Sequence, residues 1–296
     1  MDLKYIVLHM PHWQENQHIQ CMAAVESFKN HLKDEKSVAY IFEIEDIDEL
    51  KALMLGELGV LYKQNTLVLT DDGEMAFYCV DKKQDIACGV LLHETNQEEH
   101  FPTGVYCMQD LAQLEYTYLQ KVYQRAKGIP WQILTTSRLV IREITVADVP
   151  RLYELYADSS VTAYMESLFE KQEQEEEYTI QYIQNVYGFY GYGMWLITLK
   201  ETGEVIGRAG LEYKEGFDGL ELGFMLGAAY QHMGYAYEAC EAILAYGKEE
   251  LEQTAYRAVV HEDNLASQKL CARLGFTKTG AWEENDMGKY LEYCIK

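Results

Sequence analysis

The stretch that decides the fold runs from Glu221 to Leu244 and reads ELGFMLGAAYQHMGYAYEACEAIL. Residues 221–226 are typical of a strand, and the residues from 237 onward are typical of a long helix. The loop between them contains Gly234 and Ala236, whose small side chains let a ligand approach the backbone. A helix N-terminus carries unpaired N–H groups and partial positive charge, so the unit suits a diphosphate. Spacing alone also fits an ordinary strand–helix connection, because a short glycine-containing loop is not specific for phosphate.

Strands and helices alternate on both sides of this unit. We expect strands near 138–144, 194–200, 204–213, 219–226, 256–260, 276–282 and 288–295. We expect helices from about residue 147 and over 170–190, 234–251 and 264–274. This alternation predicts an α/β domain with a mixed sheet flanked by helices.

The chain has 296 residues, which makes two domains the natural expectation. A joint is predicted at Lys127-Gly-Ile-Pro-Trp131, where glycine and proline follow a helical pattern over 111–126. We therefore expect one domain over residues 1–133 and a second over residues 134–296.

Composition limits the function classes. The chain carries 25 basic and 48 acidic residues, a net charge of −23, and neither half is basic, which argues against a nucleic-acid partner. A negative field attracts amines and basic peptides, although it also serves solubility alone. No apolar run is long enough to span a membrane, and the N-terminus lacks a signal-peptide pattern. Seven scattered cysteines, none spaced as C-x-x-C, fit the reducing cytoplasm.

A family resemblance covers residues 136–296. The pattern Gln231-x-x-Gly234-x-Ala236 resembles the acetyl-CoA loop of the GNAT (GCN5-related) N-acetyltransferases. Further matches, in the same order as in the branch related to ribosomal-protein N-acetyltransferases, are residues 137–142, 191–195, 203–211, 221–224, 264–267 and 274–276. The resemblance implies an α+β GNAT fold with a central, mixed, mostly antiparallel sheet. It also implies acetyl transfer from acetyl-CoA to a primary amine, by direct attack in a ternary complex and without a metal.

The resemblance assigns the cofactor site residue by residue. The backbone of Phe224, Met225 and Leu226 would bond the pantetheine arm and the acetyl carbonyl. The N–H groups of the loop would cradle the pyrophosphate, from Gln231, His232, Met233, Gly234, Tyr235 and Ala236. Asn264 and Ser267 would lie near the thiol end of the cofactor or its pantetheine.

Acetyl transfer requires proton movement at two points. An amine with a pKa near ~10.4 is mostly protonated at pH 7, so a base must remove a proton. We expect Glu221 to be this base, acting directly or through water, or else to be a salt-bridged strand carboxylate; Glu212 is a weaker candidate. Many family members place a tyrosine acid seven residues after the asparagine, where this chain has Cys271. Cys271 is then either the acid or a buried thiol, in which case Ser267 or a nearby tyrosine would serve.

Aromatic residues mark the expected acceptor site. Tyr190, Tyr192 and Trp195 fall where related enzymes line the acceptor pocket, and an aromatic, acid-rimmed pocket suits an amine. The same rings could instead fill the core. The expected acceptor is a small-molecule or peptide amine, and the expected assembly is a monomer or homodimer.

The first half contains a second, more limited resemblance. A strand at 66–70, then Asp71 and Asp72, a helix over 74–83 and a strand at 86–92 resemble the last acidic motif of haloacid-dehalogenase (HAD)-like phosphohydrolases. This implies a Rossmann-like α/β domain in which acidic residues hold magnesium. Asp71 and Asp72 could also be simple turn residues. Further helices are expected over 12–33 and 46–58.

The nucleophile motif D-x-D of that family is missing. The early strand at 5–8 is followed by His9, and Asp46-Ile-Asp48 has the spacing but lies in a helix-like stretch. The domain is therefore expected to be non-catalytic, and to shape the acceptor site, bind a ligand or mediate assembly. Two alternatives for the whole chain stay open. One is a non-catalytic acyl-CoA-binding regulatory protein, and the other is a bifunctional protein with residual phosphohydrolase activity.

Overall fold

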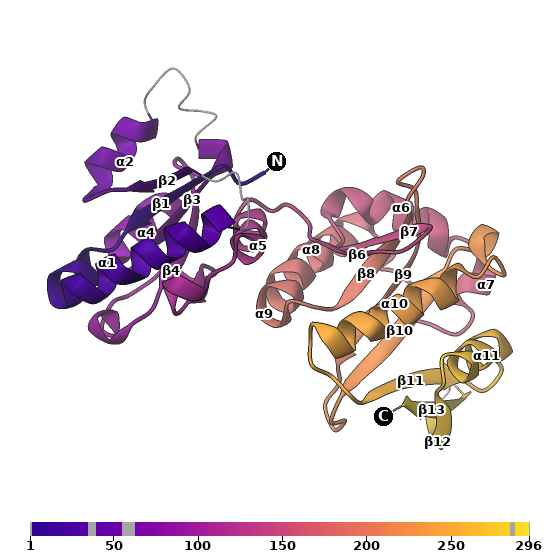
Figure 1. Cartoon of the computed structure of the whole chain (residues 1–296). Helices are drawn as coiled ribbons and strands as arrows, with labels where there is room; N and C mark the ends of the chain where they lie inside the picture. Colours follow the sequence, from indigo (N-terminus) through magenta and orange to yellow (C-terminus); the bar gives the residue numbers. More distant parts are fainter. Residues whose placement is uncertain (1, 35–39, 55–62, 285–287, 296) are drawn as a thin grey trace. The chain divides into compact units, whose positions relative to one another are not determined.

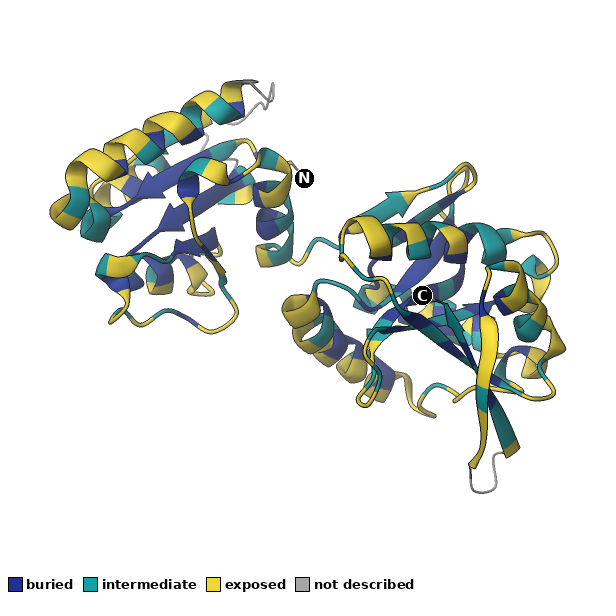
Figure 2. Ribbon diagram, turned by 60° about the horizontal axis from the view of Figure 1, so that its bottom comes forward, coloured by how far each residue is buried: buried dark blue, intermediate teal, exposed yellow. Residues whose placement is uncertain are grey.

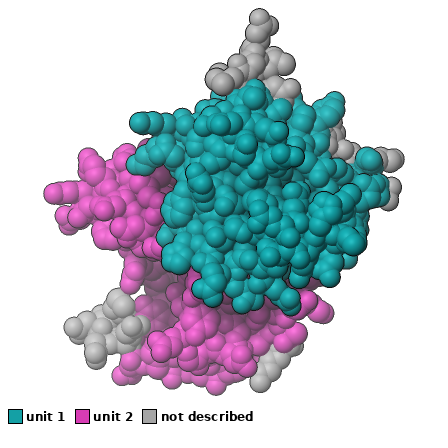
Figure 3. All heavy atoms as spheres, turned by 90° about the vertical axis from the view of Figure 1, so that its left-hand side faces the viewer, with its two compact units in different colours: residues 1–129 teal, residues 130–296 magenta. Residues whose placement is uncertain are grey.

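The computed structural model describes residues 2–34, 40–54, 63–284 and 288–295. The chain divides into two compact units, Met1–Ile129 and Pro130–Lys296 (Figure 3). The division lies four residues before the boundary expected at 133/134. The reason is the strand β6 (Gln132–Thr135), which pairs antiparallel with β7 (Leu139–Arg142) and so belongs to the second unit. None of the helices within the described ranges combines the length and apolar character needed to cross a lipid bilayer.

The first unit is built on a parallel sheet. Its described strands follow the order β2-β1-β3-β4-β5, with β1 (Tyr5–His9), β2 (Tyr40–Glu43), β3 (Thr66–Thr70), β4 (Ala87–Leu91) and β5 (Tyr106–Met108). The connecting helices are α1 (Pro11–Asp34), α2 (Ile47–Met54), α4 (Gly73–Val80), α5 (Tyr116–Ala126) and the short turns η1 (Glu94–Asn96) and η2 (Leu111–Gln113).

Both faces of this sheet are covered. Leu67 and Leu69 of β3 pack into a core with α1 and α5, whereas Val68 faces a second core with α2 and α4. Burial on both faces explains why β3 and β4 are apolar without alternation, as parallel strands usually are. Figure 2 shows the central strands buried beneath helices with exposed outer faces.

Most elements expected in the first half are present. The strand at 66–70, the following helix and the strand near 86–92 form the connected units β3, α4 and β4. The helix expected over 46–58 is α2 as far as Met54, and residues 55–58 lie outside the described residues. Strand β2 was not predicted, because its sequence YIFE does not alternate apolar and polar residues.

The second unit is built on a mixed sheet (Figure 1). After β6 and β7 come β8 (Met194–Leu199), β9 (Val205–Tyr213), β10 (Leu220–Leu226), β11 (Tyr256–His261), β12 (Thr277–Glu284) and β13 (Gly288–Ile295). The longer helices are α6 (Val149–Tyr156), α8 (Gln172–Tyr182), α10 (Tyr235–Glu249) and α11 (Leu265–Arg273). Shorter turns are η3 (Val146–Asp148), α7 (Ser159–Thr162), the π-helical η4 (Ile183–Tyr187), α9 (Gly188–Tyr190) and η5 (Ala228–Tyr230).

The strand order is β12-β13-β11-β10-β9-β8-β7-β6, and β10 with β11 is the parallel pair. The expected mixed, mostly antiparallel sheet is thereby confirmed. The two parallel strands pair only at Leu220–Tyr256 and Glu221–Arg257, after which they separate. Separation leaves the rest of β10 open along one edge, and this opening positions the site.

Opposite faces of the second sheet have different environments. Leu211 packs against Gly247 of α10, and Trp195 meets Tyr246 of α10 edge to face at 5.6 Å. Because side chains alternate along a strand, Arg208, Gly210 and Glu212 of β9 face the opposite side, toward α6 and α8. That side carries the cavity described next.

Candidate functional site

A cavity of about 1290 Å³ opens where β10 and β11 separate. Its walls are residues 221–226 of β10, the start of α10 with its preceding loop, α11, and residues 164–169 together with α8. The volume exceeds that of a pocket for one drug-sized molecule. The cavity therefore has room for a large cofactor and an acceptor side by side.

The loop before α10 is held in an unusual conformation. Gly234 is the N-cap residue, with φ at +82°, and His232 has φ at +62°. Arg138 fixes the loop from the side, because its Nη1 donates to the Met233 carbonyl at 3.1 Å and its guanidinium lies 4.4 Å from the Tyr235 ring centroid. The first N–H groups of α10 have no partner within the helix and point toward the N-terminal end. The geometry suits an anion at this end of the cavity.

Eight of the ten residues assigned to the cofactor line this cavity: Phe224, Met225, Leu226, Gln231, His232, Gly234, Ala236 and Asn264. The other two, Met233 and Tyr235, do not. The side chain of Met233 is exposed, and the ring of Tyr235 packs under Arg138. These two residues can contribute only backbone groups, because their side chains point away from the cavity.

Helix α11 adds residues that sequence reasoning missed. Lys269 and Arg273 line the cavity and bring two positive charges to it, in a chain that is otherwise strongly acidic. Asn264 caps this helix by accepting the Ser267 N–H at 3.1 Å, and Ser267 also lines the cavity. The spacing of Lys269 and Arg273, four residues apart on a helix after Asn264, was a signal for a shared face.

Cys271 is not in the cavity. Its side chain is fully buried in the core, and burial raises the pKa of the thiol to about 12. The thiol therefore stays protonated and has no access to a bound ligand. Its assignment as a catalytic residue is not supported by its position, because α11 turns this face toward the sheet.

Two carboxylates face each other on adjacent strands. Glu221 of β10 lies directly opposite Glu212 of β9, and both line the cavity. Glu221 is held by Arg257, whose Nε lies 2.9 Å from its Oε2. Glu212 accepts from the Tyr182 hydroxyl at 3.0 Å and pairs with Lys214 at 3.0 Å. Like charges placed opposite each other are unfavourable, and these partners offset the repulsion.

The three aromatic residues expected at the acceptor site do not line this cavity. Trp195 is fully buried against α10, and Tyr190 and Tyr192 lie outside the cavity, where Tyr190 stacks on Tyr213. The aromatic residues that do line the cavity are Tyr156, Tyr164, Phe169, Tyr178, Tyr182, Phe224 and Tyr237. On β8 it is Met194, the neighbour of Trp195, that points to the cavity side.

A buried guanidinium also faces the cavity. Arg208 of β9 is surrounded by Tyr156, Tyr182 and Tyr187, and its Nε is buried without a hydrogen-bond partner. No carboxylate in the described part of the chain forms an ion pair with it. Desolvating a positive charge without a counter-charge is costly, so an anionic group from a ligand would stabilise it.

The first unit places polar residues at the carboxyl ends of its strands. His9 takes the position where a nucleophile was sought, and its ring bonds Thr70 Oγ1 at 2.9 Å and the Glu45 carbonyl at 3.2 Å. Burial lowers the pKa of His9, so the ring is neutral. Asp71 is fully buried and accepts the Trp13 N–H at 2.8 Å and a bond from His93 Nε2 at 3.0 Å. Oδ2 takes both of these bonds, and Oδ1 faces the His12 N–H at 3.4 Å, so Asp71 is engaged by the start of α1 and by His93.

Comparisons with known proteins find relatives of the second unit. A family model for the acetyltransferase (GNAT) domain matches residues 138–277. The chain is 30% identical over 159 residues to "uncharacterized N-acetyltransferase p20" of Bacillus licheniformis, covering 53% of this chain and 89% of that protein. It is 30% identical over 157 residues to "uncharacterized N-acetyltransferase YoaA" of Bacillus subtilis (strain 168), covering 50% and 84%. A solved acetyltransferase from Agrobacterium tumefaciens is 28% identical, with a TM-score of 0.46, covering 55% of this chain and 93% of that one.

Proposed function

The chain belongs to the GNAT family of acetyltransferases and is an acyltransferase enzyme, and we propose that it moves an acetyl group from acetyl-CoA to a primary amine. GNAT acetyltransferases use acetyl-CoA as the donor. The observation that carries the proposal is the opening between β10 and β11, which ends at the anion-binding geometry of the loop before α10. Direct attack in a ternary complex is the reaction that such a shared cavity serves.

The residues present fit the donor. Backbone groups of Phe224 to Leu226 lie along the open edge of β10 and can pair with the amides of a pantetheine arm. The N–H groups between Gln231 and Ala236 can hold the diphosphate, with Lys269 and Arg273 adding positive charge. Acetyl-CoA supplies a thioester whose carbonyl carbon is open to attack by an amine.

The paired carboxylates suit the amine. An ammonium group between Glu212 and Glu221 would relieve the repulsion between them, and one of them would then remove its proton. We assign this base role to Glu221, because Arg257 binds one of its oxygens and so orients the side chain. Ser267 remains the donor to the leaving thiolate, since it lines the cavity and Cys271 does not.

The test is release of CoA thiol from acetyl-CoA in the presence of a panel of primary amines. We expect turnover by the wild type and a fall of about 10²–10⁴-fold in kcat for Glu221→Gln, with loss of the acidic limb of the pH profile. Glu215→Gln, on the nearby turn, is the control, and its kcat and pH profile should equal those of the wild type. Tight binding of CoA without turnover on any amine would favour the non-catalytic regulatory alternative.

The position of Arg208 limits the chemical class of the acceptor. It lies opposite Met225 on the same face as the Glu212–Glu221 pair, with the paired glycines Gly210 and Gly223 between them. The cavity floor thus has two carboxylates at one end and, at the other, a guanidinium whose Nε has no hydrogen-bond partner. We propose an acceptor with both charges, an amine that also carries a carboxylate or a similar anion.

Matched acceptors separate this refinement from the acetyltransferase activity itself. An α-amino acid and its decarboxylated amine differ only in the carboxylate, and we expect kcat/KM to favour the amino acid by about tenfold or more. Arg208→Met should remove that preference and Arg208→Lys should retain part of it, with CoA affinity unchanged. Equal rates on the two acceptors would reject the refinement while leaving amine acetylation standing.

The first unit does not contain a complete phosphohydrolase site in its described residues, because His9 replaces a nucleophile and Asp71 is engaged by the start of α1 and by His93. We therefore propose that this unit, which is built on a parallel sheet, does not hydrolyse phosphate esters. The seven cysteines are free and five are buried, which suits a reducing compartment, and we propose the cytoplasm.

A further inference from the structure

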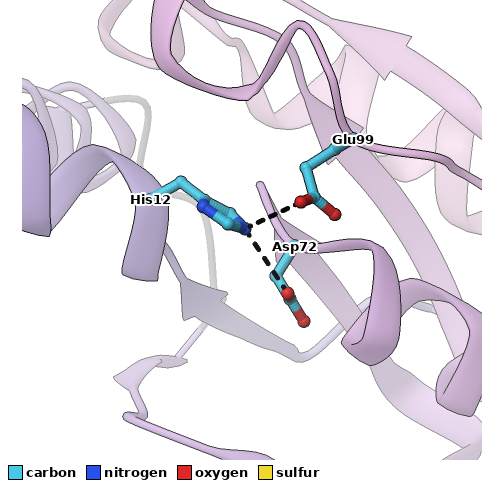
Figure 4. Close-up of side chains that lie close together, drawn as sticks. All are labelled: His12, Asp72 and Glu99. Atoms are coloured by element: carbon cyan, nitrogen blue, oxygen red, sulfur yellow. Dashed lines mark ion pairs between the residues drawn. The ribbon is translucent and has the colours of Figure 1, made fainter.

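Three side chains meet at the carboxyl edge of the first sheet (Figure 4). His12 comes from the first turn of α1, Asp72 follows β3, and Glu99 lies in the segment after η1. His12 Nε2 is 3.5 Å from Asp72 Oδ1 and 3.5 Å from Glu99 Oε1. One nitrogen and two oxygens from three separate elements therefore converge on one point, and all three residues are half-buried.

The backbone holds each of these side chains in place. Asp72 uses its Oδ2 to accept the Met75 N–H at 2.7 Å, and Glu99 uses its Oε2 to accept the Gly73 N–H at 3.2 Å. The second oxygen of each carboxylate is the one that faces His12. The buried Asp71 accepts the N–H groups of His12 and Trp13, which fixes the start of α1. The arrangement does not depend on a bound ion for its order.

Gly73 makes the approach of Glu99 possible. A Cβ at this position would lie 2.4 Å from the His100 carbonyl oxygen and 2.9 Å from Glu99 Oε2. Any other residue would push the segment that carries Glu99 away from the strand end. The absence of a side chain at Gly73 therefore allows Glu99 to lie close to His12 and Asp72.

The spacing fits a shared cation better than direct hydrogen bonds. An N–H···O bond joins atoms about 2.7–3.2 Å apart, which is shorter than both separations here. Two ligands of a tetrahedral zinc ion, each about 2.0–2.1 Å from the metal, lie about 3.4 Å apart. We propose that His12, Asp72 and Glu99 bind one divalent transition metal ion of the zinc type, with the fourth position left to water.

The donor set selects this class of metal over magnesium. An imidazole nitrogen suits zinc and similar ions, whereas magnesium takes oxygen ligands in octahedral geometry. The site also differs from the one implied by the HAD resemblance, since Asp71 takes no part and two ligands come from outside that motif. A bound ion would tie α1, the β3–α4 turn and the segment after β4 together, and so stabilise the first unit.

The experiment titrates Zn²⁺ into the metal-free full chain, with Co²⁺ absorption as a second readout of tetrahedral coordination. We expect one ion per chain, and at least a tenfold loss of affinity in His12→Gln and in Glu99→Gln. Asp72→Asn should lose affinity as well while keeping the helix cap, because asparagine caps equally well. Mg²⁺ should not compete.

The matched controls are His18→Gln on the exposed side of α1 and Glu98→Gln beside Glu99, and both should bind zinc like the wild type. All variants keep the seven cysteines, so zinc bound by thiols contributes equally to each. Thermal unfolding in chelator shows whether each variant is folded. Equal zinc affinity in wild type, His12→Gln and Glu99→Gln would overturn the proposal and leave a cluster of ion pairs.

Discussion

Glu238, in the first turn of α10, is the acceptor for a group of hydrogen bonds from the start of the second unit. It accepts from the Thr136 and Ser137 hydroxyls at 2.6 and 2.9 Å and from the Arg138 backbone N–H at 2.9 Å. Burial raises the pKa of Glu238, but these bonds and the Arg138 side chain outweigh it and lower the pKa to about 2. The carboxylate form is therefore the one that stabilises the fold.

The sign of the pH dependence follows from that shift. A carboxyl with a depressed pKa contributes stability above its unfolded value near 4.5, and the contribution disappears as pH falls toward 2. We expect Glu238→Gln to lower the free energy of unfolding by about 1–3 kcal/mol at pH 7 and by progressively less below pH 4. Urea unfolding at several pH values measures this. Glu249→Gln, exposed on the same helix, should show no such difference.

Single residues also show where prediction from sequence stops. Gly234 and Phe224, which the sequence assigns to the cofactor, both line the cavity, because their motif is a continuous stretch of chain. Trp195 and Met194 are neighbours on one strand, and only the register of β8 against β9 decides which of them faces the cavity. The sequence does not single out Arg208. Its burial, and the lack of a hydrogen-bond partner for its Nε, arise only when α6 and α8 pack against β9.

At the scale of elements, the loop before α10 was predictable and the cavity wall formed by α7 and α8 was not. Strand, loop and helix follow one another, so spacing alone places the N-terminus of α10 beside β10. The opposite cavity wall comes from α7, α8 and the residues between them, and a π-helical turn at Ile183–Tyr187 shifts the helical phase after α8. A regular helical pattern over 170–190 cannot reveal that shift.

A substitution at Gly234 tests whether the loop before α10 binds the cofactor. Its φ of +82° is strained for any side chain by about 1–2 kcal/mol, so Gly234→Ala should distort the loop and raise the Kd for CoA by about tenfold. Gly203→Ala is the matched control, because Gly203 also has a positive φ, +73°, but lies in the turn between β8 and β9. Both variants should lose similar stability, and only Gly234→Ala should lose affinity. Equal CoA affinity in the two variants would exclude the loop from the cofactor site.

At the scale of the whole molecule, the chain consists of two units with separate cores. The larger core lies within the second unit, and the two smaller cores cover the two faces of the first sheet. The alternation of strands and helices was enough to predict a mixed sheet in the second unit, and the strand–turn–helix–strand pattern at 66–92 indicated an α/β arrangement in the first. The convergence of His12, Asp72 and Glu99 was not predictable, because they are far apart in the sequence and meet only through sheet order.

The most direct test of the central claim is isothermal titration of CoA and acetyl-CoA into the full chain, repeated with residues 130–296 alone. We predict one site with a micromolar Kd in the full chain, retained within about threefold in the isolated second unit, because every residue assigned to the cofactor lies there. The absence of binding to the full chain at millimolar CoA would contradict the assignment of the β10–β11 opening as the acetyl-CoA site.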